Sequence, residues 1–212
     1  MAIKPILFNT KMVRAILDGR KDATRRIVKG FIPDDAVWGY TAFTPKGYIS
    51  CRGTFADGYG EKFFKLPCES VDILYVRETW KKAPNGYYYY EDWQRNDIAD
   101  VTKWKPSIHM PKEAARIWLK VTDVRVERLQ DITYNGALRE GSEGIRCDHV
   151  ALGVHGCTDC MNTGWIEPPQ VEFMQIWNST IKKSNLDRYG WDANPWVWVI
   201  EFERCEKPTE RR

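Results

Sequence analysis

Residues 19–26 place a lysine, a threonine and three arginines at the end of an expected helix, in the order Gly-Arg-Lys-Asp-Ala-Thr-Arg-Arg. A free lysine is protonated at neutral pH, but burial or a neighbouring arginine would lower its pKa. A neutral Lys21 would then accept the proton of the Thr24 hydroxyl, whose oxygen would attack a carbonyl carbon. The alternative is a solvated, basic helix end that complements the helix dipole.

The elements around this segment determine whether these side chains meet. We expect a short strand at residues 6–8 and then a helix, which Asn9 or Thr10 caps and Gly19 ends. Because the helix stops at Gly19, we expect Lys21 and Thr24 to lie within one turn of backbone. The apolar face of the helix consists of residues at helical spacing, Met12, Val13, Ile16 and Leu17.

The rest of the chain carries more strand signals than helix signals. Continuous apolar residues at 73–76 predict a strand that is buried on both faces, and the pair Asn85-Gly86 predicts a hairpin turn. Several strands, few short helices and no regular βαβ alternation favour an α+β fold built on a compact β-barrel. Further strands are expected at 37–40, 47–51, 87–90, 117–129 and 196–202, and further helices from Asp131 or Thr133 to near Gly141 and over 171–177.

Composition favours a soluble, cytoplasmic protein. The 212 residues are 43% hydrophobic and 29% charged, with a mean hydropathy of −0.53 and a formal net charge of +3. This charge permits nucleic acid as a partner but does not require it. No stretch approaches the ~20 apolar residues of a membrane span, and the first residues lack the apolar run of a signal peptide. We therefore expect no membrane partner.

The motif Gly-Arg-Lys-x-x-Thr-Arg-Arg resembles the signature of the ASCH domain, a family related to the PUA RNA-binding fold. Residues 70–80 are similar to the strand of this family that ends in Val-Arg-Glu-Thr-Trp. Residues 129–141 and 191–202 are similar to two later segments, and all the matches occur in the family's order. Phage-type members of the family look closest.

The resemblance also implies the domain organisation. The fold would be α+β, a PUA-like β-barrel with flanking short helices, and residues 1–206 would form this single domain. Insertions would occupy about residues 30–68 and 81–112, and a small zinc-binding Cys/His insertion would occupy about residues 142–168. Residues 207–212 would form a polar tail.

Some small bacterial ASCH proteins are amidohydrolases that deacetylate N4-acetylcytidine with a lysine, a threonine and a glutamate. By position these residues correspond to Lys21, Thr24 and Glu140. The resemblance therefore implies a hydrolase in which Lys21 is the base and Thr24 the nucleophile. Glu140 would orient the lysine or protonate the leaving amine. The alternative is a non-catalytic module that binds RNA, or DNA, through the same basic segment.

Five further residues are candidates for binding a nucleoside or a nucleic acid. Arg77 would bind a phosphate or a base edge through two parallel N–H groups, unless it pairs with its neighbour Glu78. The basic residues near position 21 would contact phosphates or form a solvated surface. The candidates are Arg20, Arg25, Arg26, Arg77 and Glu78.

Three of the six cysteines and two of the three histidines lie within residues 147–160. Zn²⁺ takes four N or S ligands in a tetrahedron, and Cys-x-x-Cys supplies two of them. The expected ligands are Cys147, His149, Cys157 and Cys160, with His155 as the alternative histidine. Four protein ligands would make this a structural zinc. The alternatives are a catalytic zinc, a nucleic-acid-binding knuckle and a set of reduced thiols.

Overall fold

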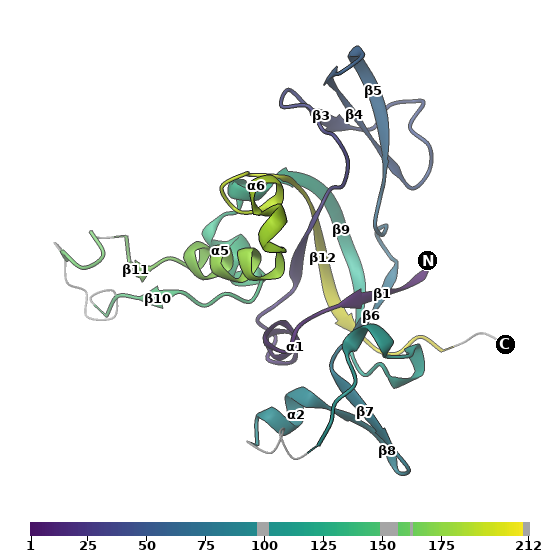
Figure 1. The fold of residues 1–212 in the computed structure, drawn as a ribbon, viewed down its shortest axis with the longest axis vertical. Helices are drawn as coiled ribbons and strands as arrows, with labels where there is room; N and C mark the ends of the chain where they lie inside the picture. The colour runs from purple at the N-terminus through teal and green to yellow at the C-terminus, as the bar shows by residue number, and fades with distance from the viewer. Residues whose placement is uncertain (97–101, 149–156, 162, 210–212) are drawn as a thin grey trace.

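Figure 1 shows the fold in a computed structural model, which describes residues 1–96, 102–148, 157–161 and 163–209. The centre is a five-stranded sheet in the order β1-β6-β9-β12-β2. β1 runs parallel to β6, and the other neighbours are antiparallel. The strands of this sheet are β1 Ile3–Leu7, β2 Ala23–Ile27, β6 Ile73–Arg77, β9 Trp118–Arg128 and β12 Trp196–Cys205.

Three small antiparallel sheets lie outside the central sheet, in the stretches where insertions are expected. The β7–β8 hairpin turns at Gly86, with φ 143°, as the Asn85-Gly86 pair predicts. The division of the chain into one domain and three insertions stays a prediction. The outer strands are β3 Val37–Gly39, β4 Tyr48–Phe55, β5 Gly58–Lys65, β7 Trp80–Ala83, β8 Gly86–Tyr89, β10 Ile145–Arg146 and β11 Trp165–Glu167.

The helices are short. Among the described residues, no helix is both long enough and apolar enough to cross a membrane. The α-helices are α1 Thr10–Leu17, α2 Tyr90–Gln94, α3 Tyr134–Arg139, α5 Pro169–Thr180 and α6 Leu186–Tyr189. Single 3₁₀ turns occur at Ser107–His109, Lys112–Ala114, Leu129–Asp131 and Lys183–Asn185.

This arrangement of many strands and few short helices confirms the expected α+β class. The order of the central sheet leaves β1 at one edge and β2 at the other. The pairing of the described strands therefore does not close into a barrel, and the barrel stays a prediction.

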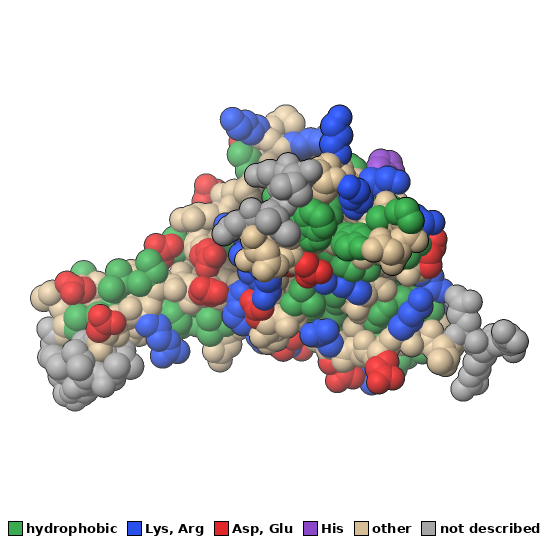
Figure 2. Space-filling view, turned by 90° about the horizontal axis from the view of Figure 1, so that it is seen from below, with side chains coloured by type: hydrophobic (Ala, Val, Ile, Leu, Met, Phe, Trp, Pro, Cys, Tyr) green, Lys and Arg blue, Asp and Glu red, His purple; other side chains and the backbone are tan. Residues whose placement is uncertain are grey.

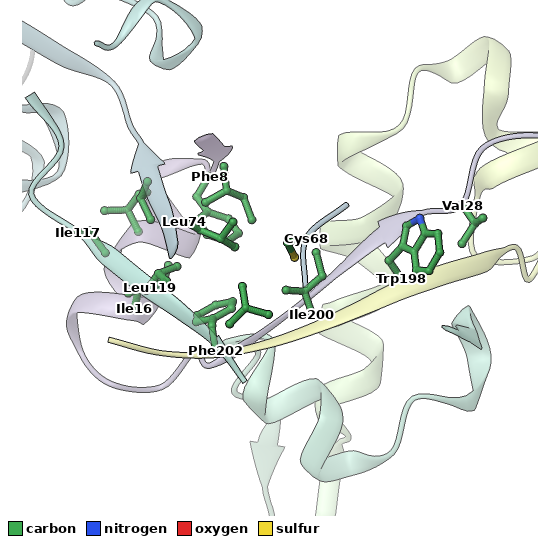
Figure 3. Packing of buried hydrophobic residues seen from close by; sticks show 14 of the residues in the cluster. Phe8, Ile16, Val28, Cys68, Leu74, Ile117, Leu119, Trp198, Ile200 and Phe202 are labelled. Carbon is green, nitrogen blue, oxygen red and sulfur yellow. The ribbon is translucent and has the colours of Figure 1, made fainter. Parts of the chain in front are cut away.

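The main hydrophobic core packs α1 against the central sheet (Figure 3). Ile16 of α1 is buried together with Leu74 of β6 and Leu119 of β9. β6 is buried along its first four residues, as its continuous apolar sequence predicts. This core holds α1 in place and so fixes where the chain leaves the helix.

The chain after α1 is extended, which differs from our expectation. The Asn9 side chain accepts a hydrogen bond from the N–H of Met12, and Gly19 leaves the helix with φ 75°, both as predicted. The residues that follow form β2, in which Thr24 lies opposite Ile200 of β12. Pairing with β12 therefore holds this segment in an extended conformation instead of a turn.

Candidate functional site

A buried ion pair joins the segment after α1 to the end of α3. Lys21 and Glu140 face each other in an isolated β-bridge, and Lys21 Nζ donates to Glu140 Oε2 at 2.7 Å. The same nitrogen donates to the backbone oxygens of Glu140 at 2.8 Å and Ala23 at 2.7 Å. The Lys21 side chain is 0% exposed and that of Glu140 is 4% exposed. All three N–H groups of the ammonium therefore have acceptors.

Glu140 reaches this position because α3 ends where the sequence predicts. The Thr133 side chain accepts a hydrogen bond from the N–H of Gly136 and so caps the start of α3. Gly141 leaves the helix with φ 92°. A Cβ at Gly141 would lie 2.7 Å from the Cβ of Ala15. The close contact between α1 and the end of α3 therefore requires glycine at this position.

Arg25 extends the ion pair into a chain of charges. Its Nη1 lies 3.3 Å from Glu140 Oε1, and its Nη2 lies 3.2 Å from Glu127 Oε2. Glu127 is a site residue that sequence reasoning missed. The alternation of apolar and charged residues in β9 marks it as polar, but nothing in the sequence connects it to a residue 102 positions away. Glu140 is thus held between Lys21 and Arg25.

Burial lowers the pKa of Lys21, because the charged ammonium has lost its contact with water. The negative charge of Glu140 and its hydrogen bond oppose this shift, whereas the charges of Arg26 and Arg25 add to it. The neutral form of Lys21 is therefore easier to reach than that of an exposed lysine.

A cleft with two lobes lies against Glu140, between α1 and α5. The lobes measure ≈ 200 Å³ and ≈ 140 Å³, and both walls include Met12, Glu140, Phe173 and Ile176. Lys21 lines neither lobe, so Glu140 is the member of the ion pair that borders the cleft. The other charged or polar wall residues are Lys11, Arg14, Arg20, Ser142, Glu143 and Glu172 in the larger lobe and Asn9, Thr24, Arg25, Arg26 and Thr180 in the smaller.

Thr24 lies in the wall of the smaller lobe and is 2% exposed. Within the described part of the chain, no hydrogen bond joins it to Lys21. Side chains alternate between the two faces of an extended chain, so residues three positions apart do not share a face. Catalysis by the predicted residues needs a desolvated Lys21 that contacts Thr24. The structure provides the desolvation but not the contact.

Three of the five predicted substrate-binding residues line the cleft: Arg20, Arg25 and Arg26. Arg20 pairs with the exposed Glu143 at 3.0 Å. Arg26 donates to the backbone oxygen of Leu7 at 2.7 Å and forms no ion pair with any described residue. Three of the predicted cations therefore lie in the wall of the cleft, and their role in binding stays a prediction.

Arg77 and Glu78 lie outside this cleft. Arg77 donates to the backbone oxygen of Ile108 and to the hydroxyl of Tyr75. Glu78 accepts two hydrogen bonds from Arg116, both at 2.9 Å, and the alternative in which Arg77 pairs with Glu78 does not occur.

Three cysteines meet at the end of the arm formed by β10 and β11, which extends from the body of the molecule in Figure 2. The sulfur atoms of Cys147, Cys157 and Cys160 lie within 4.8 Å of one another, and those of Cys147 and Cys157 are 3.5 Å apart. Tetrahedral zinc with Zn–S bonds of about 2.3 Å separates its sulfur ligands by about 3.8 Å. The backbone N–H of Cys160 lowers the pKa of Cys157, which favours the thiolate that binds metal. The cluster is thus suited to a metal ion.

The two candidate histidine ligands, His149 and His155, lie outside the described residues. Among those described, this cysteine cluster is the one group of three or more His, Cys, Asp or Glu side chains close enough to share a metal ion. Three of the four predicted ligands therefore come together, and the choice of histidine stays a prediction.

No family model, no curated protein and no solved structure matches this chain. The geometry of the cleft and of the cysteine cluster therefore carries the functional argument. Of these two features, the cleft is lined by Thr24 and Glu140, two of the three residues predicted to be catalytic.

Proposed function

We propose that this chain is an amidohydrolase of the ASCH type, with a PUA-like fold, that removes an acyl group from a modified nucleobase or nucleoside such as N4-acetylcytidine. The observation that carries the proposal is a desolvated Lys21, hydrogen-bonded to Glu140 at 2.7 Å, next to a cleft that Thr24 lines. A lysine with a lowered pKa, a carboxylate and a hydroxyl are the groups that acid–base and nucleophilic catalysis need.

Proton transfer from Lys21 to Glu140 produces the catalytic base and the catalytic acid in one step. A proton moves from Lys21 Nζ to Glu140 Oε2 along their 2.7 Å hydrogen bond, which leaves a neutral amine and a carboxylic acid. The neutral amine is the base, and the carboxylic acid is the proton donor for the leaving group. Burial of Lys21 favours this transfer, because it destabilises the ammonium.

Thr24 is the nucleophile in this mechanism. The Lys21 amine turns from the backbone oxygen of Ala23 toward Thr24 and takes the hydroxyl proton, while the Thr24 oxygen attacks the acyl carbon. The bond between the acyl carbon and the exocyclic nitrogen breaks, and Glu140 gives its proton to that nitrogen. Water then cleaves the Thr24 ester, which releases the carboxylic acid and restores the hydroxyl.

The metal of the cysteine cluster is, in this proposal, a structural zinc. Cys147, Cys157 and Cys160 supply three ligands, and His149 or His155 supplies the fourth. Four protein ligands leave no open position for water, so the ion stabilises the arm and takes no part in hydrolysis. The arm needs such a link, because β10 has two residues and β11 has three.

The complete hydrogen bonding of Lys21 opposes catalysis and favours a second function, a binding module without chemistry. All three N–H groups of Lys21 already have acceptors, which also suits an ion pair that only holds α3 to the segment after α1. The cleft would then bind RNA, DNA or a modified base without chemistry. A binding module of this kind is recognised by an affinity that falls steeply as salt rises.

Hydrolysis of N4-acetylcytidine by the purified protein, followed by chromatography of the released cytidine, tests the proposal. Lys21→Ala and Glu140→Ala should each abolish turnover. Lys120→Ala is the matched control, because Lys120 forms an exposed ion pair with Glu203 and should leave turnover unchanged. No turnover by folded, zinc-loaded protein would reject this substrate and favour the binding module.

A further inference from the structure

Arg26 differs from the other arginines of the cleft, because no carboxylate of the described residues forms an ion pair with it. Its Nη2 donates to the backbone oxygen of Leu7 at 2.7 Å, and its Cζ lies 5.3 Å from the centre of the Phe8 ring. Burial lowers the pKa of Arg26, because protein surrounds the charged group. Since a guanidinium has five N–H groups, most of those of Arg26 remain for a ligand.

The excess of positive charge in the cleft is confined to the smaller lobe. Among the described residues in the wall of that lobe, Glu140 is the one acidic side chain, and it already binds Lys21 and Arg25. The charge of Glu140 partly opposes the lowering of the Arg26 pKa, but no carboxylate of the lobe forms an ion pair with Arg26. When Glu140 is counted in both walls, the smaller lobe has two cationic side chains against one acidic side chain. The larger lobe, counted in the same way, has three of each: Lys11, Arg14 and Arg20 against Glu140, Glu143 and Glu172.

Two further features of the smaller lobe suit an anion. Asn9, the N-cap of α1, lies in its wall, and the first turn of α1 has no acidic side chain to offset the positive end of the helix dipole. Arg25 is 6% exposed, and its Nε is buried without a hydrogen-bond partner in the described structure. A buried donor of this kind gains from an acceptor that a ligand brings.

We propose that Arg26 binds a phosphate group of the substrate, so that the cleft takes a phosphorylated nucleoside in preference to the free nucleoside. This inference rests on the proposed function, which places the acylated base beside Thr24 and Glu140. Thr24 and Arg26 are two positions apart on β2, so their Cα atoms are separated by about 7 Å on one side of the strand. The ribose joins base to phosphate across this gap.

The chemistry of both groups supports this assignment. A guanidinium presents two parallel N–H groups that match two phosphate oxygens. The opposite wall of the lobe includes Phe173 and Trp177, against which a base or ribose would pack. The phosphate is either the monoester of a free nucleotide or a diester within RNA, and the two sources require separate measurements.

Calorimetric titration with cytidine, cytidine monophosphate and a short cytidine oligonucleotide tests the proposal. Native protein should bind the monophosphate or the oligonucleotide about 10- to 100-fold more tightly than cytidine. Arg26→Gln should remove this preference by weakening the binding of the phosphorylated ligands more than that of cytidine, whereas Arg26→Lys should retain part of it. Lys29→Gln, which removes an exposed charge from the same segment, should retain all of it. The thermal unfolding of each variant verifies that it is folded.

Equal affinity for cytidine and both phosphorylated ligands would overturn the inference, as would no binding of any of them. An equal effect of Arg26→Gln and Lys29→Gln would also overturn it. The assay separates this inference from the proposed hydrolase. Turnover of N4-acetylcytidine without an Arg26-dependent phosphate preference leaves the hydrolase and removes the phosphate site. A phosphate preference that needs Arg26, without turnover of N4-acetylcytidine, leaves the phosphate site and rejects the hydrolase.

Discussion

Replacing Glu140 by glutamine should destabilise the protein strongly, because it removes the negative charge that faces a fully buried lysine. The Lys21 side chain is 0% exposed, and its Nζ lies 2.7 Å from Glu140 Oε2. Glutamine keeps a side-chain oxygen and the backbone oxygen of residue 140 as acceptors, so the loss is mainly that of the charge. Removing one partner of a buried ion pair costs about 3–5 kcal/mol.

The response of Lys21 sets an upper limit on this loss. A neutral amine needs no counter-charge. The folded variant can therefore avoid the cost of a buried, unpaired ammonium by releasing the proton of Lys21. From the ordinary lysine pKa of 10.5, deprotonation at pH 7 costs about 5 kcal/mol, at about 1.4 kcal/mol per pH unit. The expected loss of unfolding free energy at pH 7 is therefore about 3–5 kcal/mol.

Urea unfolding followed by tryptophan fluorescence measures this loss. The control is the Lys120–Glu203 pair, which has a similar N–O distance of 2.9 Å but side chains that are 46% and 56% exposed. Glu203→Gln should cost no more than about 1 kcal/mol. The double variant Lys21→Met/Glu140→Gln should recover part of the loss, because it removes the buried charge of Lys21 together with that of Glu140. A loss in Glu140→Gln as small as that in Glu203→Gln would refute the reasoning.

The stability of the Glu140→Gln variant should rise between pH 7 and 10.5. In that range the unfolded chain holds a proton on Lys21, whose pKa is lowered in the folded state, so raising the pH favours folding. Gly141→Ala should lower the unfolding free energy by about 1–3 kcal/mol, because the residue has a positive φ and its new methyl group would lie 2.7 Å from Ala15 Cβ. If the cysteine cluster holds the proposed zinc, chelation or Cys160→Ser should release about one metal ion per chain and expose the β10–β11 arm to protease, with little change in the unfolding of the central sheet.

Matched variants check each of these three predictions. The variant Lys21→Met/Glu140→Gln lacks the buried amine, so its unfolding free energy should not show the rise between pH 7 and 10.5 that is expected for Glu140→Gln. Gly19→Ala also changes a glycine of positive φ but meets no atom within 4 Å, so it should cost less than Gly141→Ala. Cys205 lies outside the cysteine cluster, so Cys205→Ser should leave the metal content of the protein unchanged. Equal behaviour of variant and control would contradict the corresponding prediction.

The elements with strong local signals were predicted from the sequence. Asn9 and Gly19 mark the start and end of α1, because a cap and a glycine act through neighbouring backbone. β6, β9 and β12 follow runs of apolar and β-branched residues that suit a strand in almost any context. Glu140 was placed at the end of α3 for the same reason, since Gly141 stops that helix.

Apart from the Lys21–Glu140 pair, which the family resemblance implies, the features that depend on distant parts of the chain were not predicted. Residues 23–27 are a strand because they pair with β12, and their sequence, Ala-Thr-Arg-Arg-Ile, has no alternation of apolar and polar residues. The partner of Arg25 is Glu127, on β9, and the partner of Glu78 is Arg116, 38 residues away. Charge pairing across such separations leaves no pattern in a single sequence. It is therefore the fold, and not the motif, that decides which cations of the cleft are left without a partner.

The most direct test of the central claim is the turnover of N4-acetylcytidine by Thr24→Val beside Thr24→Ser. Valine has nearly the shape of threonine but no hydroxyl, and Thr24 is buried in the cleft wall beside Glu140. If the Thr24 hydroxyl is the nucleophile, native protein and Thr24→Ser should release cytidine, and Thr24→Val should be slower by a factor of about 10³ or more. Turnover by Thr24→Val at the native rate, or no turnover by the native protein, would contradict the proposed mechanism.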